Sequence, residues 1–203
     1  MEEFNITMEQ ENVEDSIPSI SEEQVYEFVA MNKRAAKLIG FGVMLMILSP
    51  VLLIMDESFF HDWISIFSSS ITNDTVGIIM LFTFVAIAIG LFIYSGLKLE
   101  EYRFIEFGVH MPTSTYAAIQ RKNEEFRSTF NISLIIGIFL ILFSAVPLIV
   151  LSDLGKGLGN LGIVILLAMV ALAVYIFIYN GMVTDGYNKL LKSPYTSKRE
   201  KEQ

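Results

Sequence analysis

Residues that could carry out acid–base or metal chemistry are scarce in this sequence. It has two histidines and no cysteine, which excludes disulfides, thiolate catalysis and cysteine-based metal sites. His61 stands beside Asp62, where it could bind a cation weakly or respond to pH, although a solvated acidic loop is the more common reason for such a pair. His110 lies in another segment, which the topology inferred below puts on the opposite face of a membrane. Because no hydrolase, metalloprotease or nucleotide-binding motif is present either, we expect no enzymatic activity and no catalytic, cofactor-binding or metal-binding residue.

Four long stretches of the chain lack any charged residue or histidine. They are 38–55, 76–97, 130–151 and 161–183, and each is close to the ~20 residues with which a helix crosses a bilayer. The chain is 53% hydrophobic with a mean hydropathy of +0.55, which leaves a soluble protein too little polar surface. We therefore predict an all-α integral membrane protein with four transmembrane helices, at about 36–55, 76–98, 130–151 and 161–183.

The polar side chains within these spans are neutral. They are Ser49, Thr83, Tyr94, Ser95, Asn131, Ser133, Ser144, Tyr179 and Asn180. Ser49 and Ser144 lie near Pro50 and Pro147, where a hydroxyl can bond backbone groups that a kink leaves free, so we expect them to have a structural role. Proton or ion coupling through the membrane would normally need an ionisable residue in the spans, and none is present.

Basic residues fix the expected orientation. Thirteen of the 14 Lys and Arg residues lie before the first span, between the second and third, or after the fourth, and the exception is Lys156. Because basic residues are retained on the cytoplasmic side, we expect the N-terminus, the C-terminus and the central loop to be cytoplasmic.

The remaining segments have distinct compositions. Residues 1–20 are acidic and indicate a disordered tail, while the basic tail at 193–203 could lie on anionic headgroups or act only as a stop-transfer signal. The outer loop at 56–75 has apolar residues at helical spacing and predicts a short interfacial helix, whereas the loop at 152–160 is a glycine-rich turn. The apolar residues of the first outer loop are Phe59, Phe60, Trp63, Ile64 and Phe67.

The sequence also contains an internal repeat. Residues 76–97 align without gaps on 161–182, and the shared residues include glycine, alanine and tyrosine as well as common apolar types. The identical pairs are Gly77/Gly162, Val85/Val170, Ala86/Ala171, Ala88/Ala173, Phe92/Phe177, Tyr94/Tyr179, Gly96/Gly181 and, beyond the span, Tyr102/Tyr187. The first and third spans share Gly42/Gly137 and Ser49/Ser144.

Two repeats, 21–111 and 112–192, follow from this alignment. Each has a cytoplasmic helix, an outward span, an outer loop and a returning span. The first cytoplasmic helix begins with a capping box, in which Ser21 is followed by Gln24, and the second begins at Pro112. We expect a pseudo-two-fold axis along the membrane normal. We also expect spans two and four to pack on small residues, namely Ala86, Ala88, Gly90, Ala168, Ala171 and Ala173.

Residues 33–50 and 90–102 carry a resemblance to a known family. They resemble an uncharacterised, duplicated four-helix membrane module of low-GC Gram-positive bacteria, over about residues 22–192. In that family the module often follows a helix-turn-helix regulator domain of the XRE type. Only 32 residues precede the first basic cluster here, too few for such a domain, so we expect no DNA-binding part. The resemblance implies a multi-pass protein of the bacterial plasma membrane and no known activity.

Three functions are compatible with these features. A net charge of −8 and a pI near 4.8 argue against nucleic-acid binding, so the expected partners are the lipid bilayer and either a cytoplasmic protein or another copy of the chain. The first function is that of a sensor, regulator or accessory subunit that acts through interactions. The alternatives are a transport or channel component for a hydrophobic or lipid-like solute, and an immunity protein against a membrane-active peptide.

Overall fold

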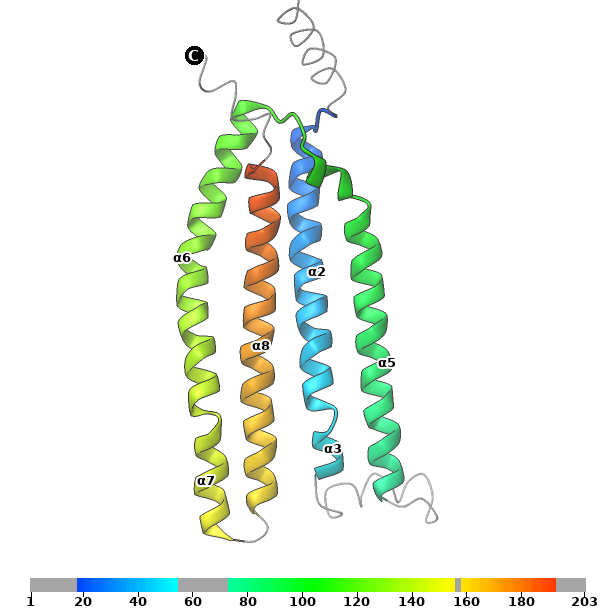
Figure 1. Ribbon diagram of the computed structural model, residues 1–203, viewed down its shortest axis with the longest axis vertical. Coiled ribbons are helices and arrows are strands. Elements are labelled where there is room, and N and C mark those ends of the chain that lie inside the picture. The colour runs from blue at the N-terminus through cyan, green and yellow to red at the C-terminus, as the bar shows by residue number, and fades with distance from the viewer. Residues whose placement is uncertain (1–17, 55–72, 156–157, 193–203) are drawn as a thin grey trace, which may run out of the picture.

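The computed structural model describes residues 18–54, 73–155 and 158–192 (Figure 1). Within these ranges the chain is helical and contains no strand, only an isolated β-bridge. The elements are α2 (Glu22–Leu48), α3 (Val51–Ile54), α5 (Asn73–Glu100), the 3-10 helix η1 (Arg103–Phe107), α6 (Thr113–Phe143), α7 (Ala145–Leu154) and α8 (Leu158–Leu191). Most of the predicted tail at 1–20, nearly all of the outer loop at 56–75 and the tail at 193–203 lie outside the described residues.

Helix α2 begins at the predicted capping box. The Ser21 hydroxyl accepts a hydrogen bond from the Gln24 backbone N–H at 3.3 Å, and the Ser21 N–H donates to Gln24 Oε1 at 3.0 Å. Each side chain thus satisfies a backbone N–H that the helix cannot bond internally. The prediction of a helix start at this position is confirmed, and α2 runs from it to Leu48 without a break.

Two serines mark breaks in the helices. Ser49 follows α2 and its hydroxyl donates to the Met46 carbonyl at 2.8 Å, while Ser144 follows α6 and donates to the Ile141 carbonyl at 2.7 Å. Proline lacks an N–H, so Pro50 cannot bond the Met46 carbonyl four residues earlier, and the Ser49 hydroxyl bonds it instead. The Ile141 carbonyl also accepts the Ser144 backbone N–H at 3.2 Å, so Ser144 bonds the backbone where α6 ends. The structural role predicted for Ser49 beside its proline is confirmed, whereas Ser144 bonds the backbone at the end of α6 and not the carbonyl four residues before Pro147.

Three helical segments among the described residues are long and apolar enough to cross a membrane. They are Thr75–Glu100, Thr113–Leu154 and Leu158–Leu191. Helix α2 is not one of them, because its charged part reaches Lys37 and the helix ends at Leu48, leaving a short apolar part. The predicted span at 36–55 is therefore divided at Ser49 and Pro50. The predicted outer turn at 152–160 is also shorter than expected, since α7 extends to Leu154 and α8 begins at Leu158.

The long helices lie side by side in the order α6, α8, α2, α5, an arrangement called the row below (Figure 1). Helix α2 packs between α5 and α8, and α8 packs between α2 and α6 with its continuation α7. A two-fold axis between the hairpins would exchange α2 with α6 and α5 with α8, so a contact of α2 with α8 would require an equal contact of α5 with α6. The described parts of α5 and α6 make no extensive contact. The expectation of a pseudo-two-fold axis is therefore wrong for this arrangement.

The expected contact between spans two and four is also wrong. Helices α5 and α8 lie on opposite sides of α2 and make no extensive contact in the described chain. Of the small residues assigned to that contact, Ala86, Gly90 and Ala168 are exposed. The other three, Ala88, Ala171 and Ala173, are fully buried but belong to packing against other helices.

Close helix packing in the row occurs instead where a glycine faces a phenylalanine ring. A Cβ atom on Gly42 of α2 would lie 2.6 Å from Phe92 of α5, and one on Gly137 of α6 would lie 2.5 Å from Phe177 of α8. Each glycine leaves space for the ring of its neighbour, and small residues of this kind let membrane helices approach closely. These contacts hold α5 against α2 and α6 against α8.

Candidate functional site

The start of α2, the end of α5 with η1, the start of α6 and the end of α8 meet at one end of the row, called the polar end below. A hydrophobic cluster fills this end, whereas only 11%, 11% and 17% of the most apolar windows of α5, α6–α7 and α8 are buried. The buried cluster consists of Ile20, Val25, Phe28, Ala36, Ile105, Val109, Met111, Ile119, Val183, Tyr187 and Leu190. The polar end is thus packed like a soluble domain, and the rest of the row exposes its apolar side chains.

The segment before α2 takes part in this packing. The Ile20 N–H donates to the His110 carbonyl at 2.9 Å, and the His110 N–H donates to the Pro18 carbonyl at 3.1 Å. Gly108, at a φ of 97° that favours glycine, turns the chain from η1 into this pairing. Residues 18–20, predicted within a disordered tail, are therefore ordered here, and the reason is the burial of Ile20, which is 2% exposed.

A pocket of about 340 Å³ opens at the polar end between α2, the end of α5 with η1, and the end of α8. Its apolar wall includes Phe28, Ile105 and Met182, and its other wall carries charged side chains. The charged lining residues are Glu100, Arg103, Glu106, Asp185 and Lys189. This pocket is called the polar-end cleft below.

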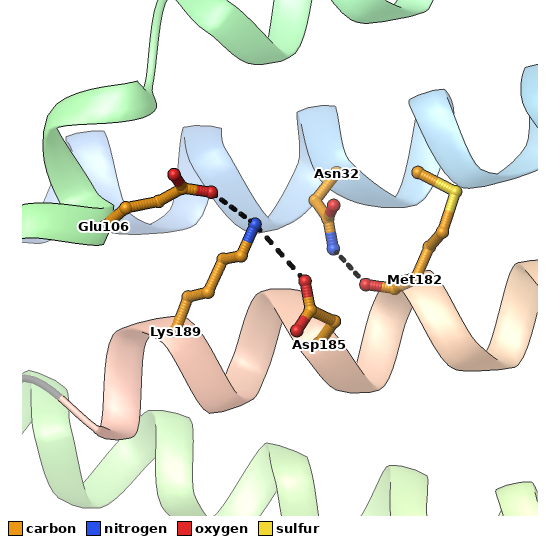
Figure 2. Close-up of polar contacts among 5 residues, drawn as sticks. All are labelled: Asn32, Glu106, Met182, Asp185 and Lys189. Atoms are coloured by element: carbon orange, nitrogen blue, oxygen red, sulfur yellow. Dashed lines mark hydrogen bonds and ion pairs between the residues drawn. The ribbon is translucent and has the colours of Figure 1, made fainter.

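Lys189 joins two carboxylates at the cleft (Figure 2). Its Nζ lies 2.6 Å from Glu106 Oε1 and 3.3 Å from Asp185 Oδ2, so α8 is tied to η1. The hydrogen bond from Lys189 holds the pKa of the Glu106 carboxyl below its ordinary value, because it favours the charged form. All three side chains remain partly exposed, so the pairs add little to stability and stay accessible to a ligand.

Asn32 connects the cleft to the packing of α2 on α8. Its Nδ2 donates to the Met182 carbonyl at 2.9 Å, and the side chain is nearly buried (Figure 2). Gly186 stands one turn beyond Met182, and a Cβ at that position would overlap the Asn32 amide. The glycine therefore leaves one side of α8 open, which lets the amide reach a helix carbonyl that neighbouring side chains would normally cover.

The charged side chains of the cleft form ion pairs with one another. The cleft brings together carboxylates and cations that are already paired, and the described residues contain no cluster of three His, Asp or Glu side chains that could hold a metal ion. His110 does not line the cleft, and His61 lies outside the described residues. The sequence interpretation missed the cleft, although Asp185 and Lys189 stand four residues apart beyond the fourth apolar stretch and so share one helix face.

The class that these helices indicate is a helical membrane protein with a packed polar end. In comparisons with known proteins, no family model, curated protein or solved structure matches the chain.

Proposed function

We propose that this chain is a non-enzymatic, four-span protein of the bacterial plasma membrane that acts as a sensor, regulator or accessory subunit by binding a cytoplasmic protein in the polar-end cleft. The observation that carries the proposal is the cleft itself, with its apolar wall and its exposed charges. Within a single copy the row supports an interaction role over transport, because the described parts of its four helices pack side by side and not around a path. The first span consists of the apolar part of α2 together with α3.

Two matched contacts support the repeat in this proposal. Gly42 meets Phe92 in one hairpin and Gly137 meets Phe177 in the other, and both members of each pair correspond in the aligned sequence. The serines that break α2 and α6 also correspond, and both donate to the carbonyl three residues earlier. Two parallel hairpins, residues 21–111 and 112–192, account for these coincidences.

The charges of the cleft indicate what kind of segment would bind. Its rim carries three carboxylates against two cations, and Glu100 and Asp185 are the more exposed, with side chains that are 65% and 63% accessible. A partner segment with one apolar side chain for the wall near Phe28 and basic side chains for the rim fits this pattern. The partner we propose is therefore a basic, amphipathic segment of a cytoplasmic protein.

Charge reversal at the rim tests this partner. Replacing Glu100 and Asp185 by lysine should lower the amount of co-purifying cytoplasmic protein at least tenfold, because two attractive contacts become repulsive. The measurement is purification of the full chain in a mild detergent, followed by identification and quantification of co-eluting proteins.

The matched control replaces Glu124 and Glu125 by lysine, since both are exposed carboxylates of α6 that do not line the cleft. This variant should retain the partner. Equal loss in both variants would contradict a specific cleft, and a purified homo-oligomer that passes solute in liposomes would favour the transport alternative.

Cysteine labelling tests the four spans and their orientation in a chain that has no native cysteine. A membrane-impermeant thiol reagent should label Ser68→Cys from outside the cell, and should label Ser114→Cys and Glu23→Cys only after the membrane is opened. Labelling of Glu23→Cys from outside would show that only three segments cross. The reverse pattern at Ser68 and Ser114 would overturn the orientation.

A further inference from the structure

We propose that copies of this chain associate head to tail in the membrane, with α5 of one copy packed against α6 of the next. The inference rests on the repeat of the proposed function and extends it. The contact between the two hairpins is made by α2 of the first and α8 of the second, which are not equivalent helices. A contact between non-equivalent surfaces is heterologous and can repeat from copy to copy. In the repeat, α2 corresponds to α6 and α8 corresponds to α5, and α6 and α5 lie at the two open edges of the row (Figure 1).

The alignment predicts which residues would meet at the new contact. Residues of α2 correspond to residues of α6 that lie 95 positions later, as in Gly42/Gly137, and residues of α8 correspond to residues of α5 that lie 85 positions earlier, as in Phe177/Phe92. In the existing contact, Gly40 of α2 faces the Tyr175 ring, and Asn32 faces Met182 and Gly186.

At the first of these pairs, the corresponding residues also combine a large side chain with a glycine, but the large residue and the glycine have exchanged helices. Gly40 corresponds to Ile135 of α6, and Tyr175 corresponds to Gly90 of α5. Ile135 is 54% exposed, while a Cβ on Gly90 would have no neighbour within 4 Å. Where the existing contact has a ring from α8 over a glycine of α2, the proposed contact has an isoleucine from α6 over a glycine of α5. Large-into-small packing of this kind drives association of helices in lipid.

The second pair is matched by charge. Asn32 corresponds to Arg127 of α6, and Gly186 corresponds to Glu101, which directly follows α5. Both charged side chains are exposed, and Glu101 is paired within the described chain only with the partly exposed Lys98 of α5. The close approach of an amide to a glycine within the chain thus becomes an arginine facing a carboxylate between chains. Opposite charges at the edge of the spans would fix the register of the two helices.

These two correspondences favour a second copy over lipid alone as the occupant of both edges. Acyl chains would cover an isoleucine or an exposed glycine equally well, and they give no reason for a size match and a charge match at the two positions that the repeat specifies. Continuing the row gives a closed ring if the rotation per hairpin closes, and an open chain of copies if it does not.

Disulfide cross-linking in native membranes tests the contact. Chains carrying only Gly90→Cys are co-expressed with chains carrying only Ile135→Cys, and oxidation should give a cross-linked dimer of the two. The control pair is Ile89→Cys with Ile136→Cys, which are also exposed to the bilayer but lie on other sides of α5 and α6. We expect at least tenfold more product from the first pair, and equal yields would overturn the proposal.

Charge exchange provides a second test, which changes the polar contact beyond the spans and keeps the same cross-link as its readout. With the Gly90/Ile135 cysteine pair in place, Arg127→Glu should lower the yield severalfold, and Arg127→Glu combined with Glu101→Arg should restore it. A cross-linking yield that is the same in all of these variants would contradict the predicted register. Failure of both tests, with partner binding and topology as proposed above, would remove the head-to-tail contact and leave the proposed function intact.

Discussion

Replacing Gly162 by alanine is expected to destabilise the protein by about 1–3 kcal/mol, as overpacking of a tight contact does. A Cβ at this position would lie 2.8 Å from the Leu148 Cα and 3.2 Å from the Pro147 carbonyl oxygen. Both are backbone atoms of α7, so no side-chain rotation can relieve the overlap. The substitution must separate α7 from α8, which thermal unfolding in detergent would report as a lower midpoint.

Gly181→Ala is the matched control on the same helix. A Cβ at Gly181 has no neighbour within 4 Å, and alanine favours a helix over glycine by about 1 kcal/mol. We therefore expect this variant to be as stable as the parent or slightly more stable. If the two alanine variants lost stability equally, the close contact between α7 and α8 would be contradicted.

The helices could be predicted from the sequence because the composition of each segment depends on whether it lies in lipid or in water. An apolar stretch such as 76–98 forms α5 because every backbone group must be bonded internally where no water is present. The start of α2 was equally predictable, since Ser21 and Gln24 satisfy its first N–H groups by local chemistry. These features depend on neighbours in sequence, which a single chain displays directly.

The pairing of the helices was not predictable in the same way. Lipid is as apolar as the side chains that face it, so the buried face of a membrane helix has no polarity signal. Ala86 and Ala171 occupy equivalent positions in the repeat, yet Ala86 is exposed and Ala171 is buried, because α5 ends the row and α8 lies within it. Identical residues therefore have different neighbours, and small size alone predicted the wrong pair of helices.

The cleft was missed because its residues come from separate parts of the chain. Lys189 and Glu106 are 83 positions apart, and no local pattern links the end of α8 to η1. The charges orient the spans through the number that lies on each side of the membrane, which does not depend on their positions around a helix. The cleft depends on those positions, and they follow from how α2, η1 and α8 pack.

The second large effect is expected from Asn32→Asp. The Asn32 amide donates to the Met182 carbonyl and is 7% exposed. An aspartate of the same shape offers only oxygen atoms when ionised, so the carbonyl loses its donor and a negative charge is buried beside it. The lost bond and the unsatisfied groups cost about 1–3 kcal/mol, and the contact of α2 with α8 should loosen. Thermal unfolding of the full chain in detergent measures this loss.

The pH dependence of this variant separates hydrogen bonding from packing. Burial raises the pKa of the introduced carboxyl above its value in the unfolded chain, so the folded state is favoured by protonation and the penalty grows as pH rises through the folded pKa. In acid the protonated group can donate to the Met182 carbonyl again, and the difference from the parent should shrink. Asn188→Asp is the control on α8, where the described residues include no partner for the side-chain amide, and it should show little loss at any pH. If Asn32→Asp showed no loss of stability at pH 8, or a loss that did not shrink in acid, a stabilising role of the hydrogen bond to the Met182 carbonyl would be contradicted.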